Sequence, residues 1–173
     1  MYIPKAFRFD DPSEIVDFMK RYSFGTIVTN KYNLPIATHL PFHIEYSEEK
    51  MILSSHFAVA NEQAKYIEDS TSLVNFTEPH AYISPSNYEK IESVPTWDYI
   101  SVHAYGNAKI ITDADVKLKE LEKVISFYEL TYLKQWDELS VKFKSNIKLN
   151  VWKRRKSSVR KKCLRKEKAS WSN

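Results

Sequence analysis

The chain has 173 residues, a length typical of one domain or of one domain with a tail. Hydrophobic residues make up 43% of it and aromatic residues 14%, which excludes a disordered polymer. No apolar run approaches the roughly 20 residues that span a bilayer, and no apolar signal segment opens the chain, so we expect neither a membrane protein nor an exported one. The single cysteine, Cys163, excludes an intrachain disulfide and favours a reduced, cytoplasmic setting.

Glycine content limits the kinds of nucleotide site that the chain can build. Its two glycines, Gly25 and Gly106, exclude the glycine-rich loops that cradle phosphates in dinucleotide-binding and P-loop proteins. Side chains and ordinary strand backbone would therefore have to hold any nucleotide cofactor.

The basic charge is concentrated at the C-terminal end. Residues 152–173 contain ten Lys or Arg and one Glu, a net of +9, while the whole chain is +4. Residues 1–151 are therefore mildly acidic, at about −5, and do not resemble a nucleic-acid-binding surface.

The first half of the chain predicts one helix followed by strands. Asp11, Pro12 and Glu14 form a helix start, and the apolar residues up to about residue 22 fall on one face. Pro35 and Pro41 make the second extended segment a bent or edge strand. The extended segments are residues 24–29, 34–46, 51–57 and 72–77, and residues 58–69 have helical spacing.

The second half predicts a long connection over residues 78–94, then either one long strand or a bent pair broken at Gly106 over 96–111, and finally two helices. Asp113 caps the first helix, and residues 135–149 form a second, looser one. Antiparallel strands with short turns, followed by helices, indicate an α+β fold with a sheet or barrel centre. The strand spacing favours a barrel that closes on itself.

The densest polar and aromatic segment is residues 80–99. Its hydroxyls and amides suit a phosphate or the edge of a ring, and Trp97 with the tyrosines suits a flat heterocycle. The alternative is a structural loop whose aromatic side chains fill the core. Composition leaves both interpretations open.

Two other polar groups have simple alternatives. His39 and His43 are four residues apart, but Pro41 disfavours a helix, and on a strand they would lie about 13 Å apart, so we predict no metal site. His56 and Asn61 lie between a strand end and a helix start, which suits either an anion site or plain helix capping. No nucleophile–base pair is evident from spacing.

Several segments, in this order, resemble the PaiB family. They are Met1-Tyr2-Ile3-Pro4-Lys5, Phe24-Gly25-Thr26-Ile27-Val28-Thr29, Ala37-Thr38-His39-Leu40-Pro41-Phe42, Pro79-His80-Ala81-Tyr82-Ile83-Ser84-Pro85-Ser86, Val94-Pro95-Thr96-Trp97-Asp98-Tyr99 and Val102-His103-Ala104-Tyr105-Gly106. The resemblance covers about residues 1–150.

The resemblance implies an FMN-binding split β-barrel, mainly antiparallel, with flanking helices. It also implies a homodimer with FMN at the interface, and negative regulation of transcription of the protease-synthesis and sporulation type. DNA as a partner follows from the resemblance alone. A small flavin-dependent oxidoreductase and a cofactor-free interaction protein are the alternatives. The positions that the resemblance assigns to the flavin pocket are His39, His56, Asn61, His80, Tyr82, Ser84, Thr96 and Trp97.

Five residues depart from the family pattern around the pocket: Val59, Glu62, Glu78, Asn87 and Asp98. Asp98 adds negative charge near a possible phosphate. These departures would weaken FMN binding or leave the pocket empty.

The tail departs most from the family pattern. We predict an FMN-binding domain over residues 1–150 and an atypical basic tail over 151–173. The tail either contacts DNA phosphates or is a solvated segment. A frameshift near Val151 would produce such a tail, and the coding DNA would decide this hypothesis.

Overall fold

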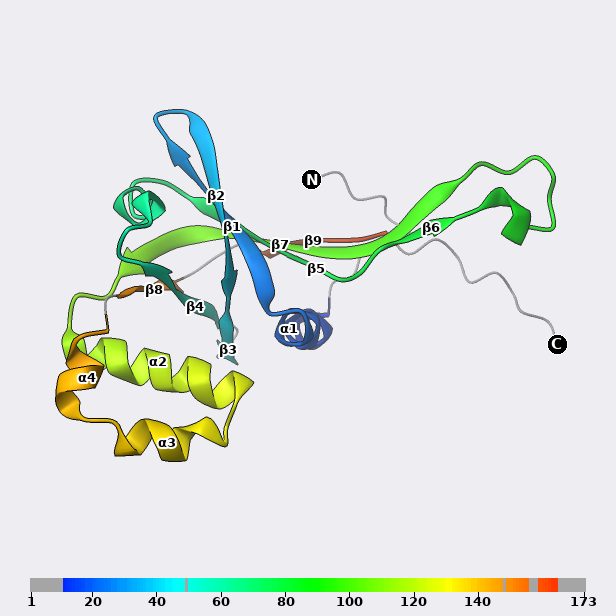
Figure 1. Ribbon diagram of the computed structural model, residues 1–173. Coiled ribbons are helices and arrows are strands. Elements are labelled where there is room, and N and C mark those ends of the chain that lie inside the picture. The colour runs from blue at the N-terminus through cyan, green and yellow to red at the C-terminus, as the bar shows by residue number, and fades with distance from the viewer. Residues whose placement is uncertain (1–10, 49, 148, 156–158, 165–173) are drawn as a thin grey trace.

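The computed structural model describes residues 11–48, 50–147, 149–155 and 159–164 (Figure 1). A single antiparallel sheet forms its centre. The strands are β1 (Phe24–Lys31), β2 (Leu34–Pro41), β3 (His43–Ser47), β4 (Lys50–Ala58), β5 (Ser72–Thr77), β6 (Ala81–Ile83), β7 (Thr96–Ile110), β8 (Leu149–Arg155) and β9 (Val159–Leu164). The main path of the sheet is β2-β1-β5-β7-β8-β4-β3, and β6 and β9 both pair with β7. The predicted α+β, mainly antiparallel architecture is confirmed.

Helix α1 (Pro12–Arg21) begins as the sequence predicts. The carboxylate of its N-cap, Asp11, accepts a hydrogen bond of 2.8 Å from the backbone N–H of Ser13. The helix buries Ile15, Val16 and Met19 against the core of the sheet. Local signals were therefore sufficient to place this element.

The sheet does not close into a barrel through hydrogen bonds, which corrects one expectation. In the described part of the chain no ladder joins the two ends of its path, β2 and β3. Prolines within β2, Pro35 and Pro41, offer no N–H to a further strand, as expected for an edge. The chain instead crosses directly from one end of the path to the other at Phe42, whose N–H donates to the Ser23 carbonyl at 2.9 Å.

Phe42 anchors this crossing in the main core. Its ring is fully buried and meets the rings of Phe76 and Trp152 edge to face, at 5.2 Å and 5.8 Å between centroids. Gly25 is required where β1 approaches β5, because a Cβ there would lie 2.9 Å from the backbone oxygen of Asn75. The two halves of the sheet therefore enclose one apolar core.

The later helices cover one end of the sheet. Helix α2 (Ala114–Tyr128) is capped by Asp113 as predicted and packs on β3 and β8, with α3 (Tyr132–Glu138) beside it (Figure 1). The looser helix expected over 135–149 is instead α3 and α4 (Val141–Ser145). Leu139 is extended and ends α3, and the hydroxyl of Ser140 caps α4. The helical spacing of residues 58–69 yields only a short 3-10 turn, η2 (Glu62–Lys65).

Strand β8 carries residues from both sides of the predicted domain boundary. It pairs with β4 and β7, and it buries Val151 and Trp152, which belong to the predicted tail. Residues 156–158 and 165–173 lie outside the described part of the chain. The boundary at residue 150 and the frameshift stay predictions, although the fold uses at least the first two tail residues as core.

Candidate functional site

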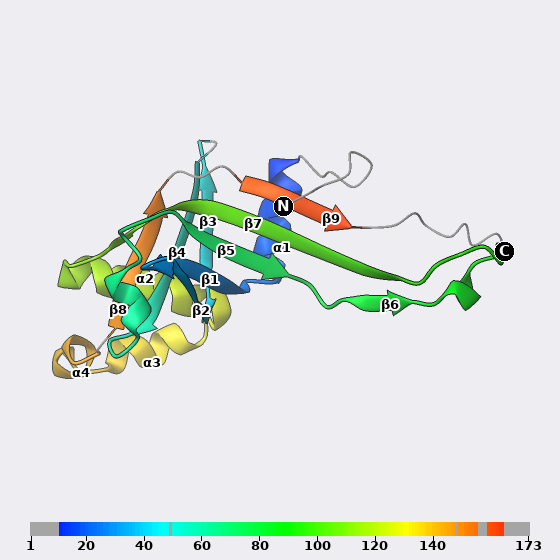
Figure 2. The same cartoon turned by 90° about the horizontal axis from the view of Figure 1, so that it is seen from above.

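A hairpin projects from the body of the molecule and carries most of the predicted pocket residues. We call residues 78–98 the arm: β6 and the beginning of β7 extend away from the rest of the sheet, as both Figures 1 and 2 show. In its ladder Tyr82 lies opposite Trp97, and Ile83 lies opposite Thr96. The long connection expected from the sequence is thus a partly paired β-hairpin.

Three aromatic side chains gather on the arm. The ring of Trp97 contacts those of His80 and Tyr82, with centroids 5.1 Å and 5.7 Å apart and both pairs inclined at 69°. Tyr82 and Trp97 each remain 54% exposed. Exposed aromatic area of this kind suits stacking against a flat heterocycle, so these rings are not the core filling that the alternative interpretation expected.

Hydroxyl groups follow the aromatic cluster along the arm. Ser84 begins the short helix η3 (Pro85–Asn87), its hydroxyl accepts from the N–H of Ser86 at 3.2 Å, and the two serine hydroxyls are 2.9 Å apart. Hydroxyl and backbone N–H groups are the donors that bind phosphate where glycine-rich loops are absent. Ser86 is exposed and Ser84 half-buried, so both remain within reach of a ligand.

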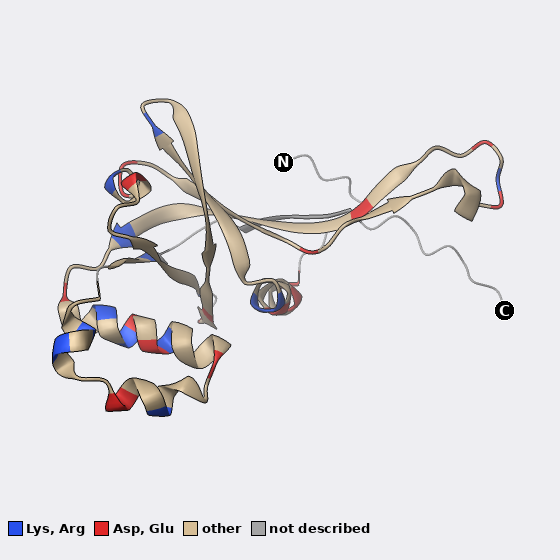
Figure 3. Cartoon of the chain, in the orientation of Figure 1, with Lys and Arg blue, Asp and Glu red and all other residues tan. Residues whose placement is uncertain are grey.

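The charge of the arm is acidic. Its charged residues are Glu78, Glu89, Lys90, Glu92 and Asp98, so four carboxylates oppose one ammonium group. Figure 3 shows acidic residues at the turn of the arm, whereas α2 carries both signs interleaved. The arm is therefore poorly suited to the phosphate backbone of DNA.

Asn61 belongs to a separate polar cluster in the body. Its side-chain oxygen caps η2 by accepting from the N–H of Gln63 at 2.9 Å, and its amide nitrogen donates to the Thr38 hydroxyl at 3.1 Å. Thr38 in turn donates to the Gln63 side-chain oxygen at 2.6 Å. Asn61 therefore has the helix-capping role that the sequence offered as the alternative to an anion site.

Gln63 is the residue of this cluster that sequence reasoning missed. It is only 1% exposed, and its side-chain nitrogen donates to the Ile27 carbonyl at 3.1 Å and to the Thr29 hydroxyl at 3.0 Å. A buried amide with satisfied hydrogen bonds fixes its neighbours. Gln63 therefore holds η2, and with it Asn61, against β1 and β2.

His39 is exposed on the face of β2 that points away from the apolar core. Its ring is exposed on β2 and stacks on Phe24, with centroids 6.4 Å apart. In the β ladders His39 lies opposite Thr26, and Thr26 lies opposite Asn75. We call this surface the outer sheet face; the register places on it Thr26, Val28, Ala37, His39, Leu73 and Asn75.

The outer sheet face is not where α1 and α2 pack, since their main contacts are with β3 and β8. The alternation of exposed and buried residues in β1 puts Ile27 and Thr29 into the core and Thr26 and Val28 outward. This alternation was visible in the sequence and is the signal that would have identified the face. A half-apolar sheet surface left open in this way is available to a partner.

His56 points away from the outer sheet face. His56 lies on β4, opposite Val151 of β8. Its Nδ1 is buried without a hydrogen-bond partner among the described residues. Burial lowers the pKa of His56, so the ring is neutral near pH 7.

The predicted pocket residues therefore form more than one group. The arm gathers His80, Tyr82, Ser84, Thr96 and Trp97, whereas Asn61, His39 and His56 belong to the body. No group of three or more His, Cys, Asp or Glu residues suited to a metal ion is found over the described residues. His39 and His43, the pair considered for a metal, lie on different strands.

The chain matches a family model along most of its length. Residues 1–152 match the model described as "Putative FMN-binding domain". The chain belongs to this FMN-binding domain family. The predicted cofactor, FMN, is the one for which the family is named.

Sequence relatives agree with this assignment. The chain is 41% identical over 145 residues to the Protease synthase and sporulation protein PAI 2 of Bacillus subtilis, covering 82% of this chain and 69% of that protein. It is 29% identical over 137 residues to the uncharacterized protein YKL070W of Saccharomyces cerevisiae, covering 65% of this chain and 80% of the other. The predicted membership of the PaiB family is confirmed.

Solved structures identify the fold. The flavocytochrome Anf3 from Azotobacter vinelandii is similar with a TM-score of 0.70 at 15% identity, covering 95% of this chain and 73% of that one. An FAD and heme binding protein from Mycobacterium smegmatis is similar with a TM-score of 0.61 at 13% identity, covering 88% and 82%. The predicted split β-barrel is confirmed, with its sheet left open between β2 and β3. Over the described residues, none of the helices has the length and apolar character needed to cross a membrane.

Proposed function

We propose that the protein is an FMN-binding negative transcriptional regulator of the protease-synthesis and sporulation type. The observation that carries the proposal is the half-exposed aromatic cluster of Trp97, Tyr82 and His80 on the arm. Family membership also supports FMN binding, and the regulatory role is drawn from the name of the Bacillus subtilis relative, Protease synthase and sporulation protein PAI 2.

The residues of the arm fit FMN. Trp97 and Tyr82 offer apolar area for the flat ring system, while the hydroxyls of Ser84 and Ser86 offer donors for the phosphate. Thr96 precedes Trp97 in β7 and lies opposite Ile83, so it faces the other side of the hairpin. Bound FMN would supply reversible electron transfer, and Trp97, Tyr82, Ser84 and Ser86 would hold and orient it. Asp98 would repel a phosphate placed close to its carboxylate.

We propose a homodimer in which the arm of each protomer lies against the other protomer. A lone two-stranded hairpin is marginal in water, and this one leaves Tyr82, Ile91, Val94 and Trp97 exposed. The outer sheet face is a half-apolar surface on which such an arm can pack. This arrangement would bring the arm residues near the partner's His39, which lies apart from the arm of its own chain. Asn61 bonds to Thr38 on the core-facing side of β2, so it lies outside this surface.

DNA as a partner rests on family inference. Because the arm is acidic, direct contact with DNA would have to use another surface of the protein. The alternative is that the protein regulates transcription through a protein partner. A cytoplasmic location also stays a prediction.

Two alternatives make different predictions in the same assays. A flavin-dependent oxidoreductase would turn over a nicotinamide cofactor and an electron acceptor with bound FMN. A cofactor-free interaction protein would show no flavin bands.

Deleting the gene in the source organism tests the regulatory role. We expect secreted protease activity and transcripts of protease genes to rise severalfold, and the wild-type gene supplied in trans to restore them. Unchanged protease transcripts would contradict the regulatory role. If the purified FMN-loaded protein also oxidised NADH or NADPH over multiple turnovers, the function would be that of an oxidoreductase.

A further inference from the structure

The interface between α2 and the sheet contains an unusual number of polar side chains. Residues directly opposite each other in an antiparallel sheet point to the same side. His43, Ser54 and Lys153 are opposite one another on β3, β4 and β8, and His56 lies two residues beyond Ser54 on the same side. Helix α2 covers this side, since the His43 ring lies 5.8 Å from the Phe127 ring.

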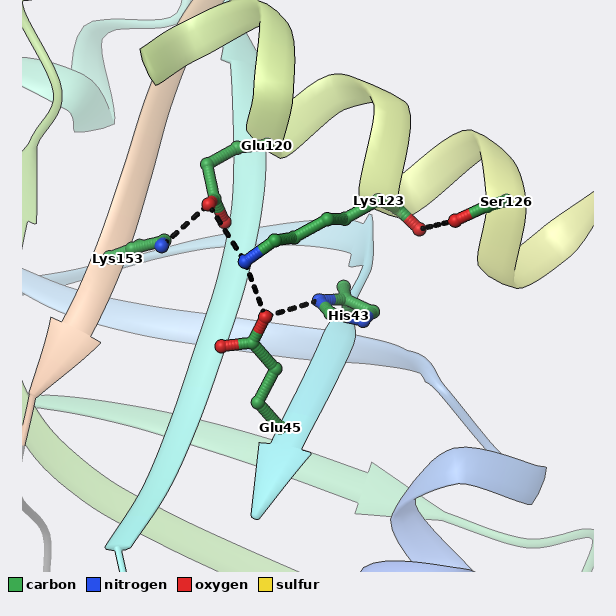
Figure 4. A network of polar contacts seen from close by, with 6 residues as sticks. All are labelled: His43, Glu45, Glu120, Lys123, Ser126 and Lys153. Atoms are coloured by element: carbon green, nitrogen blue, oxygen red, sulfur yellow. Dashed lines mark hydrogen bonds and ion pairs between the residues drawn. The ribbon is translucent and has the colours of Figure 1, made fainter. Parts of the chain in front are cut away.

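Four charged groups meet beneath α2 (Figure 4). The Lys123 ammonium donates to Glu45 at 2.6 Å and lies 3.2 Å from Glu120, while the Lys153 ammonium lies 2.5 Å from the same Glu120 oxygen. Glu120 is 3% exposed. Two carboxylates and two ammonium groups make the cluster neutral when all four are ionised.

Two histidines share this side of the sheet without hydrogen bonds to Nδ1. The Nδ1 atoms of His43 and His56 are buried, and neither has a hydrogen-bond partner among the described residues. The His43 Nδ1 lies 3.8 Å from a Glu45 oxygen, beyond hydrogen-bond distance (Figure 4). In the described part of the chain, neither Nδ1 therefore has an acceptor within hydrogen-bond distance to which a proton on it could be donated.

The charges that face His43 offset one another. They are Glu45 on its own strand, Glu120 and Lys123 on α2, and Lys153 on β8. Burial is the largest effect and lowers the pKa of His43, and burial alone lowers that of His56. Burial also opposes ionisation of Glu45, but Lys123 outweighs it and holds the pKa of that carboxyl below its usual value.

The buried apolar side chains of α2 lie outside the main core, and the hydroxyl of Tyr128 joins the end of the helix to that core by donating to the Ser23 hydroxyl and to the Phe42 carbonyl. Leu121, Val124 and Val151 are buried, yet none of them belongs to the main core cluster around Phe42 and Phe76. Few apolar contacts and many polar ones are the features of a unit that opens below the global unfolding free energy.

We propose that α2 and α3 form a latch that a proton on His43 or His56 releases from β3 and β8. The docked latch requires neutral histidines, so its stability is complete above the ordinary histidine pKa of about 6.5 and is lost as the pH falls through the lower pKa of the docked state. Release exposes Val151 and the apolar face of α2. The latch does not rest on the proposed flavin function.

Hydrogen exchange of the full chain at pH 7.5 and pH 5.5, corrected for intrinsic rates, tests the latch. Linkage makes opening more favourable by up to about tenfold per pH unit for each histidine that gains a proton. Between pH 7.5 and pH 5.5 we expect the protection of the amides in α2 to fall by a factor up to this limit, while the protection of the amides in β5 stays the same. Equal protection of α2 at both pH values, or an equal loss in β5, would overturn the proposal.

Variants separate the histidines from other titrating groups. In His43→Gln with His56→Gln, the difference in α2 protection between the two pH values should fall to less than twofold, whatever the absolute stability. His80→Gln removes an exposed histidine on the arm and should keep the full wild-type difference. A full difference in the double variant would assign the effect to other groups and overturn the proposal. Should the double variant not fold, each single variant should show about half the logarithmic difference, and a full difference in both would overturn it.

Discussion

Replacing Trp152 by alanine is expected to lower the free energy of unfolding by about 3–5 kcal/mol. The side chain is fully buried, and its ring stacks on Phe57 with centroids 5.9 Å apart and meets Phe42 edge to face at 5.8 Å. Truncation would leave a cavity between the two halves of the sheet. Urea unfolding followed by far-ultraviolet circular dichroism measures the loss.

Two matched variants control this result. Trp152→Phe keeps an aromatic ring and removes the buried indole N–H, which has no hydrogen-bond partner among the described residues, so it should cost much less than alanine. Trp97→Ala makes the same truncation at a half-exposed site and should change stability little. Equal losses for Trp152→Ala and Trp97→Ala would contradict the buried position of Trp152. They would instead support a domain that ends near residue 150, as the sequence predicts.

Replacing Trp97 by alanine is expected to weaken FMN binding roughly ten- to a hundredfold, because an aromatic side chain stacked on a flat heterocycle contributes about 1–3 kcal/mol. Trp97 contacts both of the other rings of the arm cluster, those of His80 and Tyr82. Quenching of FMN fluorescence during titration with protein gives the dissociation constant.

Trp97→Phe provides the conservative comparison and should retain most of the affinity. His39→Ala then tests whether the outer sheet face shares the site, since one protomer does not bring His39 to the arm; we expect weaker FMN binding, together with an unchanged unfolding midpoint. Full FMN affinity in Trp97→Ala would place the flavin away from the arm.

Local signals predicted the elements that local chemistry determines. Asp11 and Asp113 cap helices where the sequence placed them, and strand β5 occupies the predicted residues 72–77. The aromatic cluster of the arm was also visible as composition, because Tyr82 and Trp97 belong to its densest segment. What composition lacked was the pairing of Tyr82 with Trp97 across a hairpin.

Non-local pairing accounts for what the sequence did not reveal. Val151 and Trp152 are followed at once by a run of charged residues that begins with Lys153, and pairing with β4 and β7 is what makes that segment a strand. The open edge at β2 follows from prolines, but the crossing at Phe42 depends on packing across the sheet. Buried polar residues such as Gln63 and Glu120 interrupt the hydrophobic pattern of their segments. A prediction from hydrophobic periodicity therefore places them on the surface.

Titration of FMN with the wild-type protein, followed by fluorescence and visible absorption, tests the central claim most directly. A split barrel with the arm cluster intact should quench FMN fluorescence saturably, shift the flavin absorption bands and bind one FMN for each chain. Unquenched fluorescence and unshifted bands with protein in large excess would contradict the account and would leave the chain an FMN-family fold that has lost its cofactor.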